Sequence, residues 1–110
     1  MMIEKLQKLK ALDVKIVLKM IEAVEATAGE MVSRLEADGI YLTEGMARRR
    51  MEKLVKIGLL GKRRKNISMT LSKKIGTVYY IKKRYLNNEK FIREIKNIWE
   101  VFMNLKPAVR

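Results

Sequence analysis

The chain has 110 residues, and its hydrophobic content of 48% is enough for one compact domain with short additional elements at its ends. It contains no cysteine and no histidine, which excludes disulfides, leaves only carboxylates as metal ligands and removes the usual general base and thiol nucleophile. We therefore expect no metal site, no cofactor and no enzymatic activity. The aliphatic runs are only a few residues long, so we expect no membrane association, no signal sequence and a cytoplasmic location.

The positive charge of the chain is concentrated in one region. The whole chain carries 25 Lys and Arg against 12 Asp and Glu, a net charge of +13. Residues 43–84 hold 14 of the basic and 2 of the acidic residues, a net +12, so the remainder holds 11 and 10, a net +1. Such a local excess indicates a surface that binds a polyanion rather than a uniformly charged coat.

The N-terminal part predicts a short arm followed by a helix. Residues 1–10 form a helical arm in this interpretation, because three apolar residues recur at helical spacing: Ile3, Leu6 and Leu9. Asp13 is the expected N-cap of the next helix, since its carboxylate can accept a bond from a free backbone N–H. Residues 14–26 then carry a broad apolar face with the period of a helix.

A second, shorter helix is predicted over residues 28–38. Thr27 and Glu30 have the spacing of a capping box, in which each side chain accepts a bond from the other residue's backbone N–H. Asp38-Gly39 marks the turn at the end of this helix. Another helix starts a few residues later, and two helices joined by a short glycine-containing turn form a helix-turn-helix.

Residues 43–57 predict a helix with one apolar and one basic face. Thr43 can cap its start and Gly58 can end it in the left-handed conformation. Its apolar face consists of Ala47, Met51 and Leu54, and its basic face of Arg48, Arg49, Lys53 and Lys56, with Arg50 on the flank. The simplest alternative is a charged helix that faces only solvent. Three adjacent arginines opposed by only two acidic residues favour a helix that binds nucleic acid.

A basic β-hairpin is predicted after this helix. Two segments compete for its first strand, the basic stretch 62–65 and the alternating stretch 67–71. Residues 77–81 are the second strand, because they are β-branched and aromatic throughout. Tyr79 and Tyr80 must point to opposite faces of this strand, and we expect one of them in the core.

The C-terminal residues 89–105 predict an amphipathic helix. A heptad spacing relates five of its apolar residues, Phe91, Ile95, Ile98, Phe102 and Leu105, and the seam is widened by Ile92, Trp99 and Met103. Exposed together, Phe91, Ile95, Ile98, Trp99 and Phe102 would form a patch that soluble monomers seldom carry. We expect this helix to pair with a second copy of the chain around a two-fold axis. In one alternative the N-terminal arm folds back over this patch within one chain, through Ile3, Leu6 and Leu9. In the other, the helix packs on the core of its own domain.

The order of these elements resembles the winged helix-turn-helix family of transcription regulators, in the form of a small prokaryotic regulator of archaeal-like composition. The phrases that carry the resemblance are L-D-V-K-I-V-L for the first helix, T-E-G-M-A-R-R-R-M-E-K-L-V-K-I-G-L-L for the recognition helix and G-T-V-Y-Y-I for the second wing strand. The implied fold class is mainly α with a small β-hairpin. The implied domains are an arm at 1–10, a winged helix-turn-helix at 11–84 and a dimerisation helix at 85–110.

The resemblance also implies a DNA-binding surface. The recognition helix, 43–57, would enter the major groove, and the basic wing, 61–76, would contact the backbone or the minor groove. The implied contact residues of the helix are Thr43, Glu44, Gly45, Met46, Arg48, Arg49, Arg50 and Lys53. The implied contact residues of the wing are Arg63, Arg64, Lys65, Lys73 and Lys74. Gly45 departs from the family pattern, and either a close approach to a phosphate or a tolerated poor helix former would explain it.

The leading functional hypothesis is thus a regulator that binds double-stranded DNA sequence-specifically as a homodimer. A non-specific architectural or chromatin protein would use the same surface for phosphates only. A winged helix that serves RNA binding or protein assembly is a third possibility. No small-molecule effector site is visible in the sequence.

Overall fold

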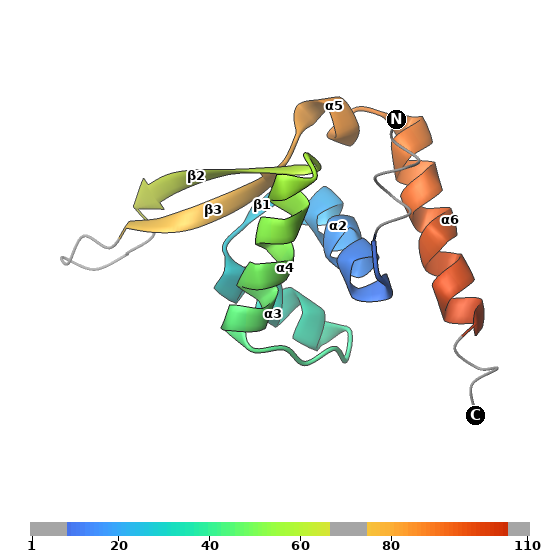
Figure 1. Cartoon of the computed structure of the whole chain (residues 1–110), viewed down its shortest axis with the longest axis horizontal. Coiled ribbons are helices and arrows are strands. Elements are labelled where there is room, and N and C mark those ends of the chain that lie inside the picture. Colours follow the sequence, from blue (N-terminus) through green and yellow to red (C-terminus); the bar gives the residue numbers. More distant parts are fainter. Residues whose placement is uncertain (1–8, 67–74, 106–110) are drawn as a thin grey trace.

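The computed structural model describes residues 9–66 and 75–105, which form a helical body with a protruding β-hairpin (Figure 1). The elements in chain order are α2 (Ala11–Ala23), β1 (Glu25–Ala26), α3 (Ala28–Ala37), α4 (Glu44–Lys56), β2 (Leu60–Asn66), β3 (Ile75–Ile81), α5 (Lys83–Leu86) and α6 (Glu89–Leu105). None of the described helices is long and apolar enough to cross a membrane.

The core lies where α2, α3 and α4 pack against one another. Each helix contributes the apolar stripe that its period predicts, and the largest fully buried side chains include Met20, Met31, Leu35, Met51 and Leu54. Thr27 and Glu30 form the predicted capping box, with Glu30 N–H to Thr27 Oγ1 at 3.1 Å and Thr27 N–H to Glu30 Oε1 at 2.8 Å. The helix-turn-helix predicted from the sequence is therefore present.

The start of α2 corrects one prediction. Lys10 occupies the N-cap position, and Asp13 lies three residues into the helix instead of capping it. Its carboxylate Oδ2 accepts the backbone N–H of Lys10 at 3.1 Å. The spacing allowed both positions, because a carboxylate can bond to a free N–H from inside the first turn as well as from the cap.

The sheet has three antiparallel strands in the order β1-β3-β2, rather than the two strands of the predicted hairpin. β1 pairs with β3 through Glu25 opposite Tyr80 and Ala26 opposite Tyr79. A strand of two residues carries no periodic signal, so the sequence could not reveal it. The segment 62–65 lies within β2, and the competing segment 67–71 lies outside the described residues.

Strand β3 separates its two tyrosines as predicted. Tyr79 is buried in the core, whereas Tyr80 lies on the opposite face of the sheet and is half-buried. Gly61 is directly opposite Tyr80, and a Cβ at position 61 would overlap the tyrosine ring. The guanidinium of Arg63 lies 5.4 Å from the centre of the same ring.

Helix α6 packs along α2, which changes the interpretation of the C-terminal element (Figure 1). Phe91 and Ile95 are fully buried in the core of their own chain, so these two members of the predicted dimer interface have no surface left for a partner. Ile98, Trp99 and Phe102 are only partly buried. The N-terminal half of α6 therefore follows the alternative of a helix packed on its own domain. Of the arm at 1–10, only Leu9 and Lys10 are described, and Leu9 is in the core.

Candidate nucleic-acid interface

Helix α4 is held at both ends by the signals that its sequence predicted. Thr43 Oγ1 accepts the backbone N–H of Met46 at 3.2 Å, and Glu44 places a carboxylate in the first turn. Gly58 ends the helix with a φ of 90°, a conformation that a residue with a Cβ seldom adopts. These signals set the residues at which the helix begins and ends.

One stripe of α4 points directly away from the core. Gly45, Arg49 and Lys56 are four and seven residues apart, so they lie on one side of the helix, opposite its buried face. All three are exposed. Within the described residues, Arg49 and Lys56 make no ion pair within 4.0 Å. The most outward cations of this helix are therefore available to an external anion.

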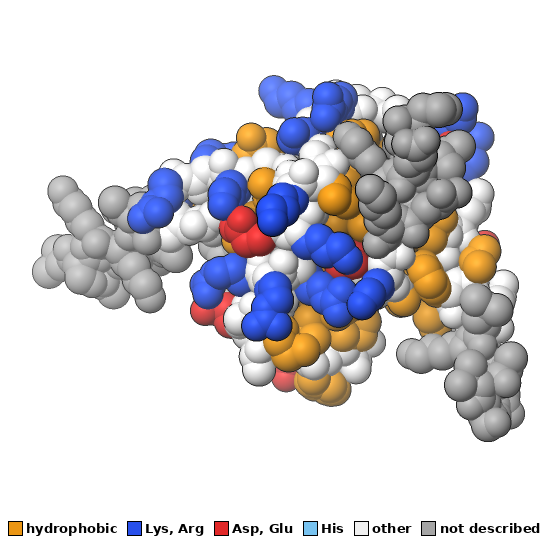
Figure 2. Space-filling model, in the orientation of Figure 1, with side chains coloured by type: hydrophobic (Ala, Val, Ile, Leu, Met, Phe, Trp, Pro, Cys, Tyr) orange, Lys and Arg blue, Asp and Glu red, His pale blue; other side chains and the backbone are white. Residues whose placement is uncertain are grey.

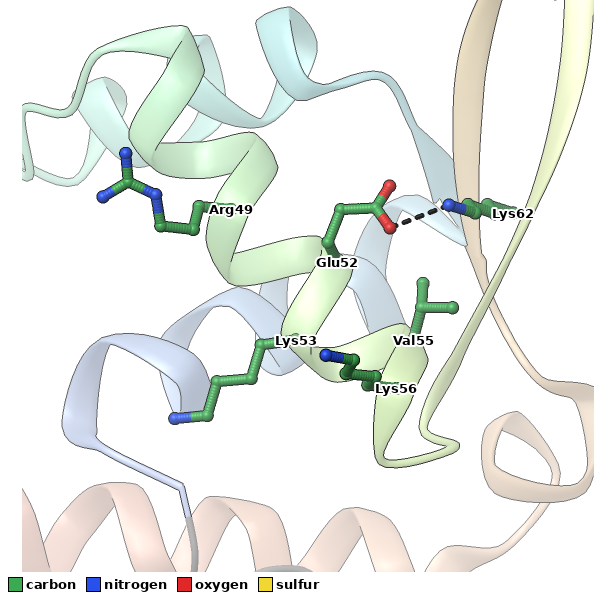
Figure 3. Close-up of a pocket in the computed structure, with 6 residues that line it drawn as sticks. All are labelled: Arg49, Glu52, Lys53, Val55, Lys56 and Lys62. Atoms are coloured by element: carbon green, nitrogen blue, oxygen red, sulfur yellow. Dashed lines mark hydrogen bonds and ion pairs between the residues drawn. The ribbon is translucent and has the colours of Figure 1, made fainter.

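A groove of about 620 Å³ runs beside this stripe, between α4 and β2 (Figure 3). It is lined by Arg49, Glu52, Lys53, Val55, Lys56 and Lys62. In Figure 3, Arg49 and Lys53 point away from the hairpin, while Glu52 points toward Lys62 of β2. A smaller groove of about 250 Å³ on the other flank is lined by Lys10, Met46, Arg49, Arg50 and Lys53. Both flanks of the outward stripe thus carry positive charge.

The buried carboxylate of Asp13 anchors two of the predicted contact residues. Arg50 Nη1 lies 3.4 Å from Asp13 Oδ1, and Lys53 Nζ lies 3.2 Å from Asp13 Oδ2. Asp13 is fully buried, whereas the side chains of Arg50 and Lys53 remain 30% and 38% exposed. Asp13 thus ties the start of α2 to α4 and leaves part of each cation facing outward.

A second carboxylate, Glu52, ties α4 to the hairpin. Its Oε1 accepts a bond from Lys62 Nζ at 2.8 Å, and its Oε2 accepts one from the hydroxyl of Tyr79 at 2.6 Å. The bond from Lys62, followed by that from Tyr79, lowers the pKa of Glu52. Burial, together with the bond to this carboxylate, raises the pKa of Tyr79. Both oxygens of Glu52 are therefore occupied within the chain, and their bonds connect α4 to both strands of the hairpin.

The two faces of the hairpin carry different basic residues. Arg63 and Lys65 both pair with Glu25 of β1, and Lys65 Nζ lies 3.4 Å from Glu25 Oε1. The bond from Arg63 is the main cause of the lowered pKa of Glu25. The alternation of a strand places Lys62 and Arg64 on the other face, toward α4. The wing residues predicted together from the sequence are thus divided between the two faces of the sheet.

The structure brings most of the predicted helix residues into one surface. Figure 2 shows Lys and Arg side chains gathered over α4 and along β2. Arg48 lies on the flank of this surface, where its Nη2 is 3.4 Å from Glu44 Oε2. Lys73 and Lys74 lie outside the described residues. The predicted contact set omitted Lys56 and Lys62. The sequence could have indicated both, because Lys56 has helical spacing from Arg49 and Lys62 has strand spacing from Arg64.

Together, α3, α4 and the β2–β3 hairpin form a winged helix-turn-helix. In the part of the chain that the structure covers, no three His, Cys, Asp or Glu residues are grouped so as to hold a metal ion.

The comparisons with known proteins agree with this fold. No protein-family model and no curated protein matches the chain. Among the solved structures similar to it is the crystal structure of a PadR family transcriptional regulator from Eggerthella lenta DSM 2243. That match has a TM-score of 0.55 and 18% sequence identity, and it covers 84% of this chain and 76% of the other. At this identity the likeness is one of fold.

Proposed function

We propose that the protein is a transcription regulator that binds double-stranded DNA and acts in the cytoplasm, with α4 in the major groove and the hairpin against the backbone or the minor groove. The single observation that carries this proposal is the outward stripe of α4, where Arg49 and Lys56 project opposite the buried face between two basic grooves. The major groove of B-DNA admits an α-helix, and α4 is held on the core by its apolar face while its cationic face points outward.

The side chains of this surface suit different parts of DNA. The planar guanidinium of Arg49 can donate two parallel bonds to the O6 and N7 atoms of guanine. Met46 is 45% exposed beside Arg49 and offers an apolar contact for the methyl group of thymine. Lys53 and Lys56 are longer, flexible point charges that suit phosphates. We assign Arg64 to the phosphates that face the wing, since it lies on the side of the sheet that faces α4.

The test is selection of bound duplexes from random-sequence and genomic DNA, followed by affinity measurement over a range of salt. We expect an enriched motif and an affinity that falls steeply with salt. Arg49→Ala should cost about 1–3 kcal/mol of binding energy on the enriched motif and relax its base preference. Arg34→Ala is the matched control, because Arg34 is an exposed arginine on α3 outside this surface.

Two outcomes would contradict the proposal. Uniform retention of all sequences would favour an architectural protein that contacts phosphates only. An affinity that hardly responds to added salt, or an Arg49→Ala variant that binds like the Arg34→Ala control, would show that this surface does not bind DNA.

We further propose that the regulator is a homodimer joined through the C-terminal half of α6. Ile98, Trp99 and Phe102 keep part of their surface exposed, and Val101 and Met103 beside them are 58% and 41% exposed. A second copy of α6 would cover these side chains, and a two-fold axis would set two recognition helices at successive major grooves.

Sedimentation at micromolar concentration tests the dimer. The intact chain should sediment as a dimer, and Phe102→Glu should shift it to a monomer. Tyr41→Ser is the control, because Tyr41 is a 75% exposed aromatic residue in the turn between α3 and α4. A monomeric intact chain, or a Phe102→Glu variant that stays dimeric, would contradict this interface.

A further inference from the structure

Within the described residues, nothing in the structure requires a glycine at position 45. It lies in the first turn of α4, and it is not among the residues with positive φ, unlike Gly39 at 83° and Gly58 at 90°. A Cβ built at position 45 would have no neighbouring atom within 4 Å, whereas one at Gly61 would overlap the Tyr80 ring. Alanine would therefore fit this position without any change in the structure.

Glycine is also an unfavourable choice at this position. It lowers the stability of a helix relative to alanine, because its backbone loses more conformational freedom on folding. Neither packing nor backbone geometry offsets that loss within the described chain. A molecule that approaches the helix from outside would give the glycine a reason that the described residues do not supply.

The position of Gly45 indicates what approaches it. Gly45 lies one turn before Arg49 on the outward stripe, and the next residue, Met46, lines the basic groove on the α2 flank. In helix-turn-helix proteins the N-terminal residues of the recognition helix come nearest to the bases. A bare Cα at this point allows the helix to advance by about the thickness of a methyl group, which a side chain would prevent.

We infer that Gly45 is the point of closest approach between α4 and DNA, where the wall of the major groove comes into van der Waals contact with the backbone of the helix. This inference rests on the proposed function. Any side chain at position 45 holds α4 away from the groove and lengthens the contacts of Arg49 and its neighbours. Gly45 is accordingly a positioning residue that sets the depth of the helix in the groove.

The experiment compares Gly45→Ala with the unaltered protein, with Gly45→Leu and with Ser33→Ala, a control on the exposed surface of α3. Gly45→Ala should raise the melting temperature by roughly 2–6 °C, because alanine restricts the unfolded chain and favours the helix. The same variant should bind DNA about tenfold more weakly, as expected for a methyl group forced into a close-packed contact. Gly45→Leu should bind more weakly still, and Ser33→Ala should bind like the unaltered protein.

A loss on every duplex would place the contact at the sugar–phosphate backbone, and a loss confined to the enriched motif would place it at a base edge. Both results support the inference. An affinity of Gly45→Ala equal to or above that of the unaltered protein, while Arg49→Ala still weakens binding, would overturn it and leave the proposed function standing. An unaltered protein that binds no duplex would instead overturn the proposed function.

Discussion

The buried carboxylate of Asp13 should be one of the most important single side chains for stability. It lies between the start of α2 and the recognition helix, fully buried, with three donors: the Lys10 N–H at 3.1 Å, Arg50 at 3.4 Å and Lys53 at 3.2 Å. Replacement by alanine removes all three interactions at once. Replacement by asparagine keeps an oxygen that can accept the Lys10 N–H but removes the charge.

The burial and the partners of Asp13 set how much unfolding free energy each variant should lose. The bond between the Lys10 N–H and the carboxylate is worth about 1.5–3 kcal/mol, because its acceptor is charged and buried. The pairs with Arg50 and Lys53 are worth about 0.5–1 kcal/mol each, since solvent partly screens both cations. Asp13→Ala should therefore lower the free energy of unfolding by roughly 2.5–5 kcal/mol, and Asp13→Asn by roughly 1–2 kcal/mol.

Urea unfolding monitored by circular dichroism measures both losses of unfolding free energy. Each should lower the urea concentration at the midpoint without changing the slope of the free energy against urea concentration. Glu22→Gln is the matched control, because the pair of Lys19 with Glu22 is at the surface and its loss should cost less than about 0.5 kcal/mol. An Asp13→Ala variant destabilised by less than about 1 kcal/mol would refute the reasoning, since the three donors would then tolerate the loss of their buried acceptor.

Two further predictions concern backbone strain and pH. Val24 has a φ of 69°, which is strained for a β-branched residue, and its side chain is 46% exposed. Val24→Gly should therefore raise the free energy of unfolding by about 1 kcal/mol in the same urea titration. A loss of stability would show that the contribution of the valine side chain outweighs the backbone strain. Tyr79 stays protonated in the fold because its pKa is raised above the ordinary 10.0, so the stability that it contributes is complete below pH 10 and is lost as the pH rises further. Thermal melts should show a steeper alkaline loss for the unaltered protein than for Tyr79→Phe, and parallel curves would contradict the assignment.

The sequence by itself determined the helices α2, α3, α4 and α6 and their order, but it did not reveal the short helix α5. The apolar stripe of α4, the capping box at Thr27 and the glycine at position 58 are local signals, and each depends on residues within one or two turns. The separation of Tyr79 from Tyr80 was equally local, because a strand alternates its faces whatever its surroundings. The outward stripe of α4 could therefore be predicted before its neighbours were known.

Only the tertiary structure decided which charges remain available on that surface. Asp13 meets Arg50 and Lys53 across 37 and 40 residues of sequence, and Glu25 meets Arg63 across 38, separations over which no periodic pattern extends. The two-residue strand β1 and the burial of Phe91 in the core of its own chain have the same origin. Such contacts depend on how the elements pack. The sign of a charge predicts only that it can form an ion pair, and the packing of the elements decides whether an opposite charge lies close enough.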